Sequence, residues 1–424
     1  MIRNLKVLML LVVIAATGLA TGLGKIENRV SAIKSYPATV CPGTNTDGTA
    51  TAIIPNSKVL GTSIPSNLNK MKEIGSSTFV SKKALLVDGG QVTSTSILRV
   101  GSALAAVNCS ISDGDDWFIG GSSNVSSKGT IAIINSGLSS AIVDLKVFSS
   151  KAALVITKTI PANSAQYILT DSLAPGEDSI AVNAITRAGR VSIFMLDNRK
   201  SGLRSMGTDY VAPASAPSKL IVIPNIPTSS GKDDQLLRVV VPGNVSANLK
   251  ATVLSSDGSF APIGIDGTSV NAGAVKDFKF KPIVADSSYS LVLESDVPIG
   301  ASVLTINSGD LIWATATTTL KDTSIQLGGF TPLFRFYGKT IDINLSWIDT
   351  RGKRSGKHIF GNDTVAFRSK VGLTRVSITT NQSDNYGSLL LDSGSGYALL
   401  PITSGSHLES AVLPRSDART INRG

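Results

Sequence analysis

Short apolar runs separated by turn-forming residues follow one another along most of the chain. Ile341–Trp347 alternates apolar and polar residues, which is the pattern of a strand with one buried face. Ser, Thr and Gly are abundant between the runs, which suits short strands joined by tight turns. After the N-terminal segment, no stretch has the spacing of a long amphipathic helix. The pattern therefore predicts an all-β chain.

One strand–turn–strand pattern occurs twice, in Gly129–Ser150 and in Gln235–Ser256. Each copy has an apolar run, a turn centred on Gly137 or Gly243, and a second apolar run that ends in Ser-Ser. A repeat period of about 100 residues is the size of one β-sandwich domain. We therefore predict tandem immunoglobulin- or fibronectin-like β-sandwich modules after one N-terminal transmembrane helix.

That helix is predicted from Val7–Gly24, an uncharged and mostly apolar segment between Lys6 and Lys25. Its length is at the short end of what spans a bilayer, and the basic residues before it predict a cytoplasmic N-terminus. We expect a single-pass signal anchor in the cell membrane, with the C-terminal part extracytoplasmic. Ala16–Gly18 and Leu19–Thr21 only approximate a cleavage site, so an anchor is favoured over a signal peptide whose removal would give a secreted protein.

The order of these features predicts the domain organisation, and the Pro/Ser/Ala-rich Val211–Pro217 is interpreted as a linker between modules. The predicted parts are a cytoplasmic stub (1–6), a transmembrane signal anchor (7–24), a stalk (25–48), a first β module with a disulfide (49–125), a second β-sandwich (126–215), a third β-sandwich (216–320), a fourth, divergent β module (321–404) and a basic tail (405–424).

The chain has two cysteines, Cys41 and Cys109, both after the apolar segment. In an exported chain, two such residues are best interpreted as one disulfide. Closing a loop of that length would stabilise the fold by roughly 4 kcal/mol in the chain-entropy model. Two cysteines without a nearby histidine cannot fill a tetrahedral shell, so we expect no metal site.

Asp115, Asp116, Trp117 and Phe118 form an acidic and aromatic segment shortly after the second cysteine. Aromatic residues make up only 5% of the chain, so a neighbouring pair is notable. One interpretation is a ligand platform rimmed by acidic residues. The alternative is a tryptophan that covers the disulfide and the core at a junction between modules.

The formal net charge is +10, and the densest basic run contains Arg351, Lys353, Arg354 and Lys357. As the tip of a hairpin, this run could bind an anionic wall polymer, lipid headgroups or a protein. As a solvated turn it needs no partner. Nucleic acid is not expected to be a partner of an exported chain.

Catalytic motifs were searched for without success. The two histidines, His358 and His407, have neither the Gly-x-Ser-x-Gly nor the His-Glu-x-x-His context. No phosphate-binding loop follows a predicted strand, and no cofactor is indicated. We therefore predict a protein that is not an enzyme and has no catalytic residues.

The chain resembles a known family in the order of its features. An N-terminal apolar segment precedes Cys41-Pro42-Gly43, Cys109 precedes Trp117–Gly121, and strand–turn–strand modules follow. This order resembles the uncharacterised exported family of actinobacteria called domain of unknown function 5719. The resemblance implies a cell-envelope protein that works beside a membrane glycosyltransferase in envelope polysaccharide assembly, and it implies no catalytic residue.

We accordingly expect a membrane-anchored extracytoplasmic binding or scaffold protein whose partners are the membrane, envelope glycan or the glycosyltransferase. One alternative is a carbohydrate-active enzyme or accessory module that uses scattered carboxylates. A second alternative is a self-assembling surface or adhesion protein.

Overall fold

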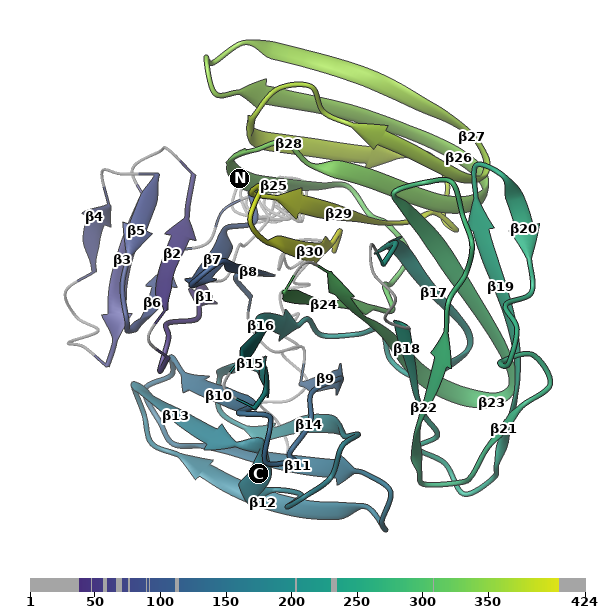
Figure 1. Ribbon diagram of the computed structural model, residues 1–424. Coiled ribbons are helices and arrows are strands. Elements are labelled where there is room, and N and C mark those ends of the chain that lie inside the picture. The colour runs from purple at the N-terminus through teal and green to yellow at the C-terminus, as the bar shows by residue number, and fades with distance from the viewer. Residues whose placement is uncertain are drawn as a thin grey trace, which may run out of the picture. The chain divides into compact units, whose positions relative to one another are not determined.

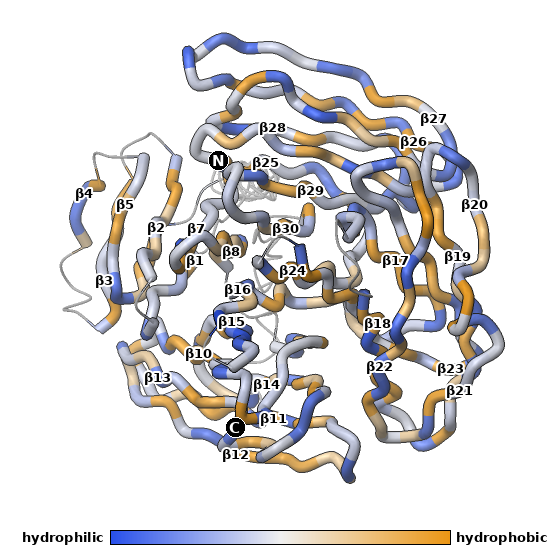
Figure 2. The backbone as a smooth tube through the Cα atoms, in the orientation of Figure 1, coloured by the Kyte–Doolittle hydropathy of each residue, from blue (hydrophilic) through white to orange (hydrophobic). Residues whose placement is uncertain are grey.

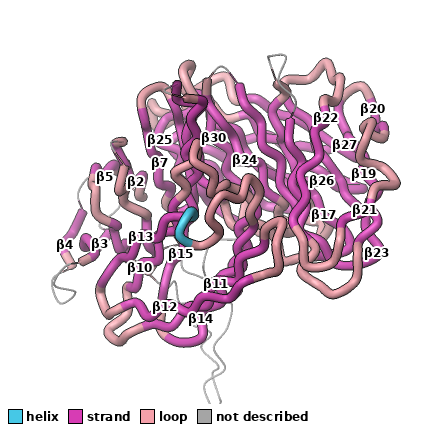
Figure 3. Tube along the Cα trace, turned by 60° about the horizontal axis from the view of Figure 1, so that its bottom comes forward, coloured by secondary structure: helices cyan, strands magenta, loops and turns pink. Residues whose placement is uncertain are grey.

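The computed structural model describes residues 38–403, except for 47, 56–58, 66–70, 75–76, 89, 91, 111–113, 203, 230–234 and 308. These residues belong to one compact unit, Tyr36–His407. Strands make up nearly all of its regular structure, and one short 3-10 helix, η1 (Thr170–Ser172), is the exception among the described residues (Figure 3). The prediction of an all-β chain is confirmed.

The strands fall into four repeats along the chain (Figure 1). Repeat 1 contains β1 (Thr39–Cys41), β2 (Thr49–Ile53), β3 (Val59–Ile64), β4 (Lys72–Ile74), β5 (Thr78–Val80), β6 (Ala84–Val87), β7 (Thr95–Val100) and β8 (Ala103–Asn108). Repeat 2 contains β9 (Asp115–Ile119), β10 (Thr130–Asn135), β11 (Ala141–Phe148), β12 (Leu154–Ile160), β13 (Ser164–Leu169), β14 (Ala181–Ala188), β15 (Val191–Ser201) and β16 (Arg204–Val211).

The third repeat also has eight strands and the fourth has six, and both include strands longer than any in repeats 1 and 2. Repeat 3 contains β17 (Ser218–Pro227), β18 (Gln235–Val240), β19 (Ala247–Ser255), β20 (Gly258–Phe260), β21 (Ser269–Val270), β22 (Val275–Phe280), β23 (Ser288–Asn307) and β24 (Asp310–Thr315). Repeat 4 contains β25 (Thr323–Phe330), β26 (Leu333–Asp349), β27 (Arg354–Arg368), β28 (Leu373–Thr380), β29 (Tyr386–Asp392) and β30 (Tyr397–Pro401).

All four repeats have the same strand pairing. We name the strand positions of a repeat A to H in chain order. In repeat 1 one sheet has the order β1-β6-β3-β4 and the other β5-β2-β7-β8, and in repeat 2 the corresponding orders are β9-β14-β11-β12 and β13-β10-β15-β16. Both repeats therefore consist of an A-F-C-D sheet and an E-B-G-H sheet, with antiparallel neighbours.

Repeats 3 and 4 have the same pairing, but some of their long strands each occupy two of the positions. The first part of β23 pairs with β17 and β19 as position F, and its second part pairs with β18 and β24 as position G. In repeat 4, β26 supplies positions B and C, and β27 supplies D and E. The two sequence copies Gly129–Ser150 and Gln235–Ser256 thus contain the same two positions, B and C, in neighbouring repeats.

Alternation of apolar and polar residues places one face of each sheet in a core. Hydrophobic and hydrophilic residues alternate along β19 and β22, for example (Figure 2). In repeat 2, Ile131 and Ile133 of one sheet pack with Val143 and Leu145 of the other in a single buried cluster.

The cores also continue from repeat to repeat. Leu333 and Leu390 of repeat 4 belong to the core of repeat 3, and Ile97 and Leu104 of repeat 1 belong to the core of repeat 4. Phe194 of repeat 2 packs into the core of repeat 1. The repeats are therefore packed against one another, not merely joined in series.

A buried arginine connects repeats 2 and 3. The Arg238 side chain on β18 is 1% exposed, and its guanidinium is 2.8 Å from both carboxylate oxygens of Asp277. It also donates to the backbone oxygens of Gly121, Ile180 and Asp178 in repeat 2. Because all its polar neighbours are acceptors, the charge is fully compensated inside the protein.

The four H strands, β8, β16, β24 and β30, lie together near the middle of Figure 1. Each contacts the next in the order β8, β16, β24, β30, and β30 contacts β8. Because H is the last strand of each repeat, the links that leave the repeats also start from this common centre.

The immunoglobulin- or fibronectin-like arrangement is not confirmed. In a constant-type immunoglobulin domain the first strand lies beside the second, and the seventh lies beside the sixth. Here position A pairs with F and position G pairs with B, as in β1–β6 and β10–β15.

The expected single-pass membrane placement is corrected. Among the residues that the structure describes, no helix is long and apolar enough to cross a membrane. The predicted stub, anchor and most of the stalk, which include Val7–Gly24, lie outside those residues, as does the predicted basic tail.

Candidate functional site

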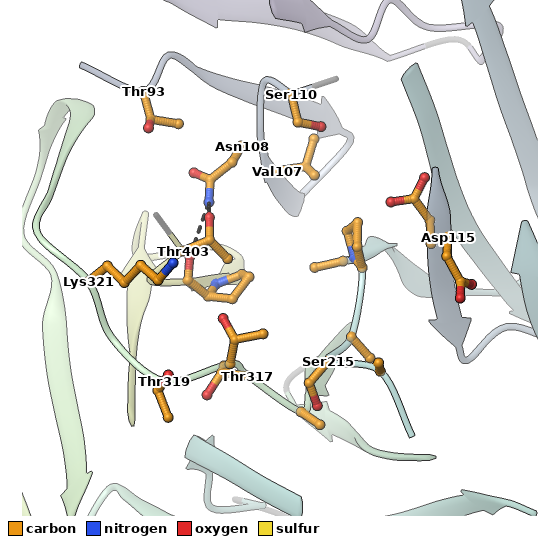
Figure 4. Close-up of a pocket in the computed structure, with 18 of the residues that line it drawn as sticks. Thr93, Val107, Asn108, Ser110, Asp115, Ser215, Thr317, Thr319, Lys321 and Thr403 are labelled. Carbon is orange, nitrogen blue, oxygen red and sulfur yellow. Dashed lines mark hydrogen bonds between the residues drawn. The ribbon is translucent and has the colours of Figure 1, made fainter. Parts of the chain in front are cut away.

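A cavity of about 500 Å³ lies where the H strands end. Its walls come from the end of β8, the start of β9, the links that follow β16 and β24, and the end of β30 (Figure 4). The lining residues are Thr93, Val107, Asn108, Cys109, Ser110, Asp115, Asp116, Ala212, Pro213, Ala214, Ser215, Ala216, Ala316, Thr317, Thr318, Thr319, Lys321, Pro401 and Thr403.

Short hydroxyl side chains and small apolar residues share the walls about equally, and no aromatic ring is among the lining residues. Three side chains carry formal charge, namely Asp115, Asp116 and Lys321. In Figure 4, Lys321 and Asp115 lie on opposite sides of the cavity. The cavity therefore offers hydrogen-bonding groups along its walls and opposite charges at two of its edges.

The links that form the walls are held by backbone hydrogen bonds. The Ser215 N–H donates to the Ala316 oxygen at 2.9 Å, and the Ala214 N–H donates to the Trp117 oxygen at 2.7 Å. The Asn108 side-chain amide donates to the Pro401 oxygen at 3.0 Å and lies 3.4 Å from the Thr403 hydroxyl. All four repeats thus contribute fixed groups to one site.

The disulfide Cys41–Cys109 is confirmed and belongs to this wall. Its two sulfur atoms are 2.03 Å apart, and both residues are almost fully buried. It ties β1 to the segment that follows β8, so it fixes the wall that Cys109 and Ser110 form.

Three lining residues carry a buried side-chain oxygen that has no hydrogen-bond partner among the described residues: Thr93 Oγ1, Asn108 Oδ1 and Thr317 Oγ1. A buried polar atom without a partner costs roughly 1–3 kcal/mol. The three atoms are closed to solvent on the cavity side as well, so they are buried in the wall and are not open to a molecule in the cavity.

The structure separates the predicted acidic and aromatic segment into two parts. Asp115 and Asp116 are at the start of β9 and line the cavity, and Asn183 donates a hydrogen bond to Asp115. Trp117 and Phe118 follow on the same strand but are 7% and 0% exposed. Asp115 and Asp116 thus lie at the cavity, whereas the aromatic pair is core.

Trp117 is covered by a neighbouring repeat. Its ring stacks on Phe148 with centroids 5.8 Å apart, and it packs in one cluster with Val240 and Val275 of repeat 3. The interpretation of Trp117 and Phe118 as a ligand platform is therefore corrected, because neither side chain is available to a ligand.

The predicted basic surface is on the β26–β27 hairpin and contributes nothing to the cavity lining. Arg351, Lys353 and Arg354 are exposed around the turn, where the Asp349 carboxylate accepts two backbone N–H groups at 2.8 and 2.9 Å. Lys357 lies three positions after Arg354 on β27, so the two side chains point to opposite faces. Its ammonium is 5.3 Å from the centroid of the Phe367 ring, so the four residues do not form one patch.

The histidines have no catalytic arrangement in the described structure. His358 Nε2 is 2.8 Å from Asp342 Oδ1 on the same hairpin, and this neighbour lowers the pKa of Asp342. His407 lies outside the described residues.

Sequence reasoning missed a buried carboxylate at the opposite end of the H strands. Asp310, the first residue of β24, is 1% exposed. Its Oδ2 atom accepts the backbone N–H of Leu104 on β8 at 3.0 Å and of Tyr397 on β30 at 3.1 Å. It also accepts the N–H groups of Leu311 and of Thr208 on β16. One carboxylate therefore joins all four H strands, and each strand reaches the cavity a few residues later.

Two more buried carboxylates lie beside Asp310. Asp209 accepts the Trp313 backbone N–H at 2.8 Å, and Asp197 accepts the Trp313 indole N–H at 2.9 Å. Burial raises the pKa of Asp310 to about 6, although four backbone N–H groups oppose the shift. Burial also raises the pKa of Asp209 well above its usual value, and the neighbouring Asp310 and Asp197 add to that shift. This cluster connects the repeats and does not line the cavity.

The fold and site define an all-β protein of four related repeats with a cavity where the repeats end. A protein-family model matches residues 86–359, and its description is "Family of unknown function (DUF5719)". The chain belongs to this family, as its sequence features predicted. An actinobacterial origin stays a prediction. No curated protein matches the chain.

Proposed function

We propose that this protein is a non-enzymatic, extracytoplasmic binding protein of the bacterial cell envelope and that the cavity is its ligand site. The observation that carries the proposal is the cavity of about 500 Å³ to which all four repeats contribute. Its volume is within the range of roughly 300–1,000 Å³ typical of small-ligand sites. Wall hydroxyls and opposite charges at the edges suit a polar ligand.

The disulfide supports the extracytoplasmic part of the proposal. Disulfides persist in oxidising compartments and are rare in a reducing cytosol. Cys41–Cys109 is almost fully buried beside the cavity. The assignment to the envelope rests on the family resemblance.

Binding is favoured over catalysis by the chemistry of the lining residues. Asp115 and Asp116 are consecutive on β9, so their side chains leave opposite faces of the strand. A glycosidase needs two carboxylates that converge on one bond, which this pair is poorly placed to do. Cys109 is tied in the disulfide and is not a free nucleophile.

Three expectations from the sequence are kept as proposals beside ligand binding. The first two are a scaffold role beside a glycosyltransferase and self-association at a surface, and a protein with a ligand cavity can have either. A relation to immunoglobulin or fibronectin sandwiches is proposed on the strand pairs B–E and C–F, which β10–β13 and β11–β14 form in repeat 2.

The test is a binding screen followed by a search for turnover. The full-length protein is mixed with short peptides, neutral and amino-sugar oligosaccharides, and sugar phosphates, and binding is detected by saturation-transfer NMR. Ligands that bind are then incubated with the protein overnight and analysed by mass spectrometry. We expect binding of at least one class without change of the ligand. Turnover of a bound ligand, or no binding to any class, would contradict the proposal.

A further inference from the structure

We propose that the cavity binds a short peptide by its two charged ends, with the ammonium group at Asp115 and the carboxylate at Lys321. This inference rests on the proposed function and names the class of ligand.

The two charges have the placement that such a ligand needs. Asp115 is an exposed residue at the edge of β9, and Lys321 is an exposed residue on the link before β25. Figure 4 shows them on opposite sides of the cavity, with Thr317 and Ser215 on the wall that connects those sides. A ligand with both charges can therefore span the site.

Both charged groups can form a further hydrogen bond or ion pair with a ligand. Asn183 donates to one oxygen of Asp115, and a carboxylate has about four acceptor positions. Within the part of the chain that the structure describes, the Lys321 ammonium makes no ion pair. An ammonium and a carboxylate of the ligand would each gain a charge-assisted hydrogen bond.

The wall between the charges suits a peptide backbone. A peptide presents alternating N–H and C=O groups, and the hydroxyls of Ser215 and Thr319 can both donate and accept. The Thr318 and Thr403 hydroxyls belong to the same lining and can serve a peptide in the same way. The links that hold Ser215 and Thr317 lie outside the named strands.

The composition of the wall disfavours a sugar as the preferred ligand. A sugar ring has an apolar C–H face that binding sites commonly cover with an aromatic ring, and the lining has none. The apolar lining residues are small, chiefly Ala212, Ala214, Ala216 and Ala316. They leave room for small peptide side chains and give no stacking surface.

The experiment measures affinities of the full-length protein by calorimetry for trialanine, N-acetyl-trialanine and trialanine amide. We expect trialanine to bind about tenfold more tightly than either capped peptide, since each cap removes one charge pair. Asp115→Asn should weaken trialanine and leave N-acetyl-trialanine unchanged. Lys321→Gln should weaken trialanine and leave trialanine amide unchanged.

Surface variants with the same chemical change serve as controls. Asp171→Asn and Lys128→Gln alter exposed residues outside the lining and should leave all affinities unchanged. Since Asp115→Asn also alters the bond to Asn183, urea unfolding checks that each variant is folded.

Equal affinity for capped and uncapped peptides would overturn the inference, as would binding of an oligosaccharide in the absence of peptide binding. If an oligosaccharide binds in the cavity and is not converted, the inference fails but the proposed function still holds. Absence of binding to every class in the screen would overturn both.

Discussion

Asp310 Oδ2 accepts the backbone N–H of Leu104 at 3.0 Å, although 206 positions separate the two residues in the sequence. The bond joins the last strand of repeat 3 to the last strand of repeat 1. The same carboxylate also accepts N–H groups from Tyr397 in repeat 4 and Thr208 in repeat 2. The strands that carry these groups end at the cavity, so Asp310 sets the spacing of the elements that form it.

We predict that Asp310→Ala destabilises the protein by more than about 3 kcal/mol, because several buried N–H groups lose their acceptor at once. The measurement is urea unfolding followed by circular dichroism. Asp171→Ala, which removes the same group from an exposed position, should change the free energy of unfolding by less than about 0.5 kcal/mol. A loss below about 1 kcal/mol for Asp310→Ala would show that the carboxylate does not join the repeats.

The same residue should make stability depend on pH. Burial raises the pKa of Asp310 to about 6 from a usual value of 3.8, so the folded state binds the proton more tightly than the unfolded state. The contribution is therefore fully present below about pH 4 and is lost as the pH rises through about 6. Over that range, wild type should lose roughly 2–3 kcal/mol relative to Asp310→Asn, which cannot titrate.

The comparison with Asp310→Asn is needed because other carboxylates act in the opposite direction. The Ser150 hydroxyl and the Lys151 ammonium lower the pKa of Glu177, so its contribution is lost as the pH falls. The measured quantity is the difference in unfolding free energy between wild type and variant from pH 4 to pH 8. A difference that stays constant over this range would mean that Asp310 titrates normally.

Replacing Arg238 should lower the free energy of unfolding far more than replacing an exposed charged residue. Arg238→Ala removes the cation that pairs with Asp277, which keeps only the Ser179 hydroxyl, and removes a donor from three backbone oxygens, so we expect a loss of about 3–5 kcal/mol. Lys250→Ala removes an exposed ion pair with Glu294 at 3.5 Å and should cost less than about 1 kcal/mol. Urea unfolding of the two variants side by side checks the contrast, and equal losses would contradict it.

Loss of the disulfide should affect both stability and binding. The double variant Cys41→Ser with Cys109→Ser should be destabilised by roughly 4 kcal/mol, because the unfolded chain gains freedom. It should also bind cavity ligands more weakly, since Cys109 is part of the wall. Intact mass before and after reduction checks the bond itself. An unchanged mass would show that the two cysteines are not joined.

Much of the fold could be predicted from the sequence because it depends on local patterns. Alternating apolar residues predicted the strands. The similarity of Gly129–Ser150 to Gln235–Ser256 marked the segments that form positions B and C in repeats 2 and 3. Repeat 4 escaped this comparison because its B and C positions are one continuous strand, β26, without the glycine turn. A pairing rule such as A with F depends on contacts between distant segments and leaves no local signal.

The candidate site was predictable only in part. The cysteines and the acidic residues at 115 and 116 stood out by composition, and Val211–Pro217 was recognised as a link, although not as a wall. The two interpretations of Trp117 could not be separated from the sequence, because Val240 and Val275, which cover it, come from another repeat. Asp310 could not be identified, since its partners Leu104 and Tyr397 are 206 and 87 positions away.

The central claim is that the cavity at the ends of the H strands is where this protein binds its ligand. The most direct test is the affinity of the full-length protein for a ligand from the screen, compared between wild type, Thr319→Trp and Thr159→Trp. Thr319 lines the cavity, whereas Thr159 is exposed on β12 outside the lining. The account predicts that Thr319→Trp weakens binding at least tenfold, or about 1.4 kcal/mol, and that Thr159→Trp leaves it unchanged. Unchanged binding in a folded Thr319→Trp variant would contradict it.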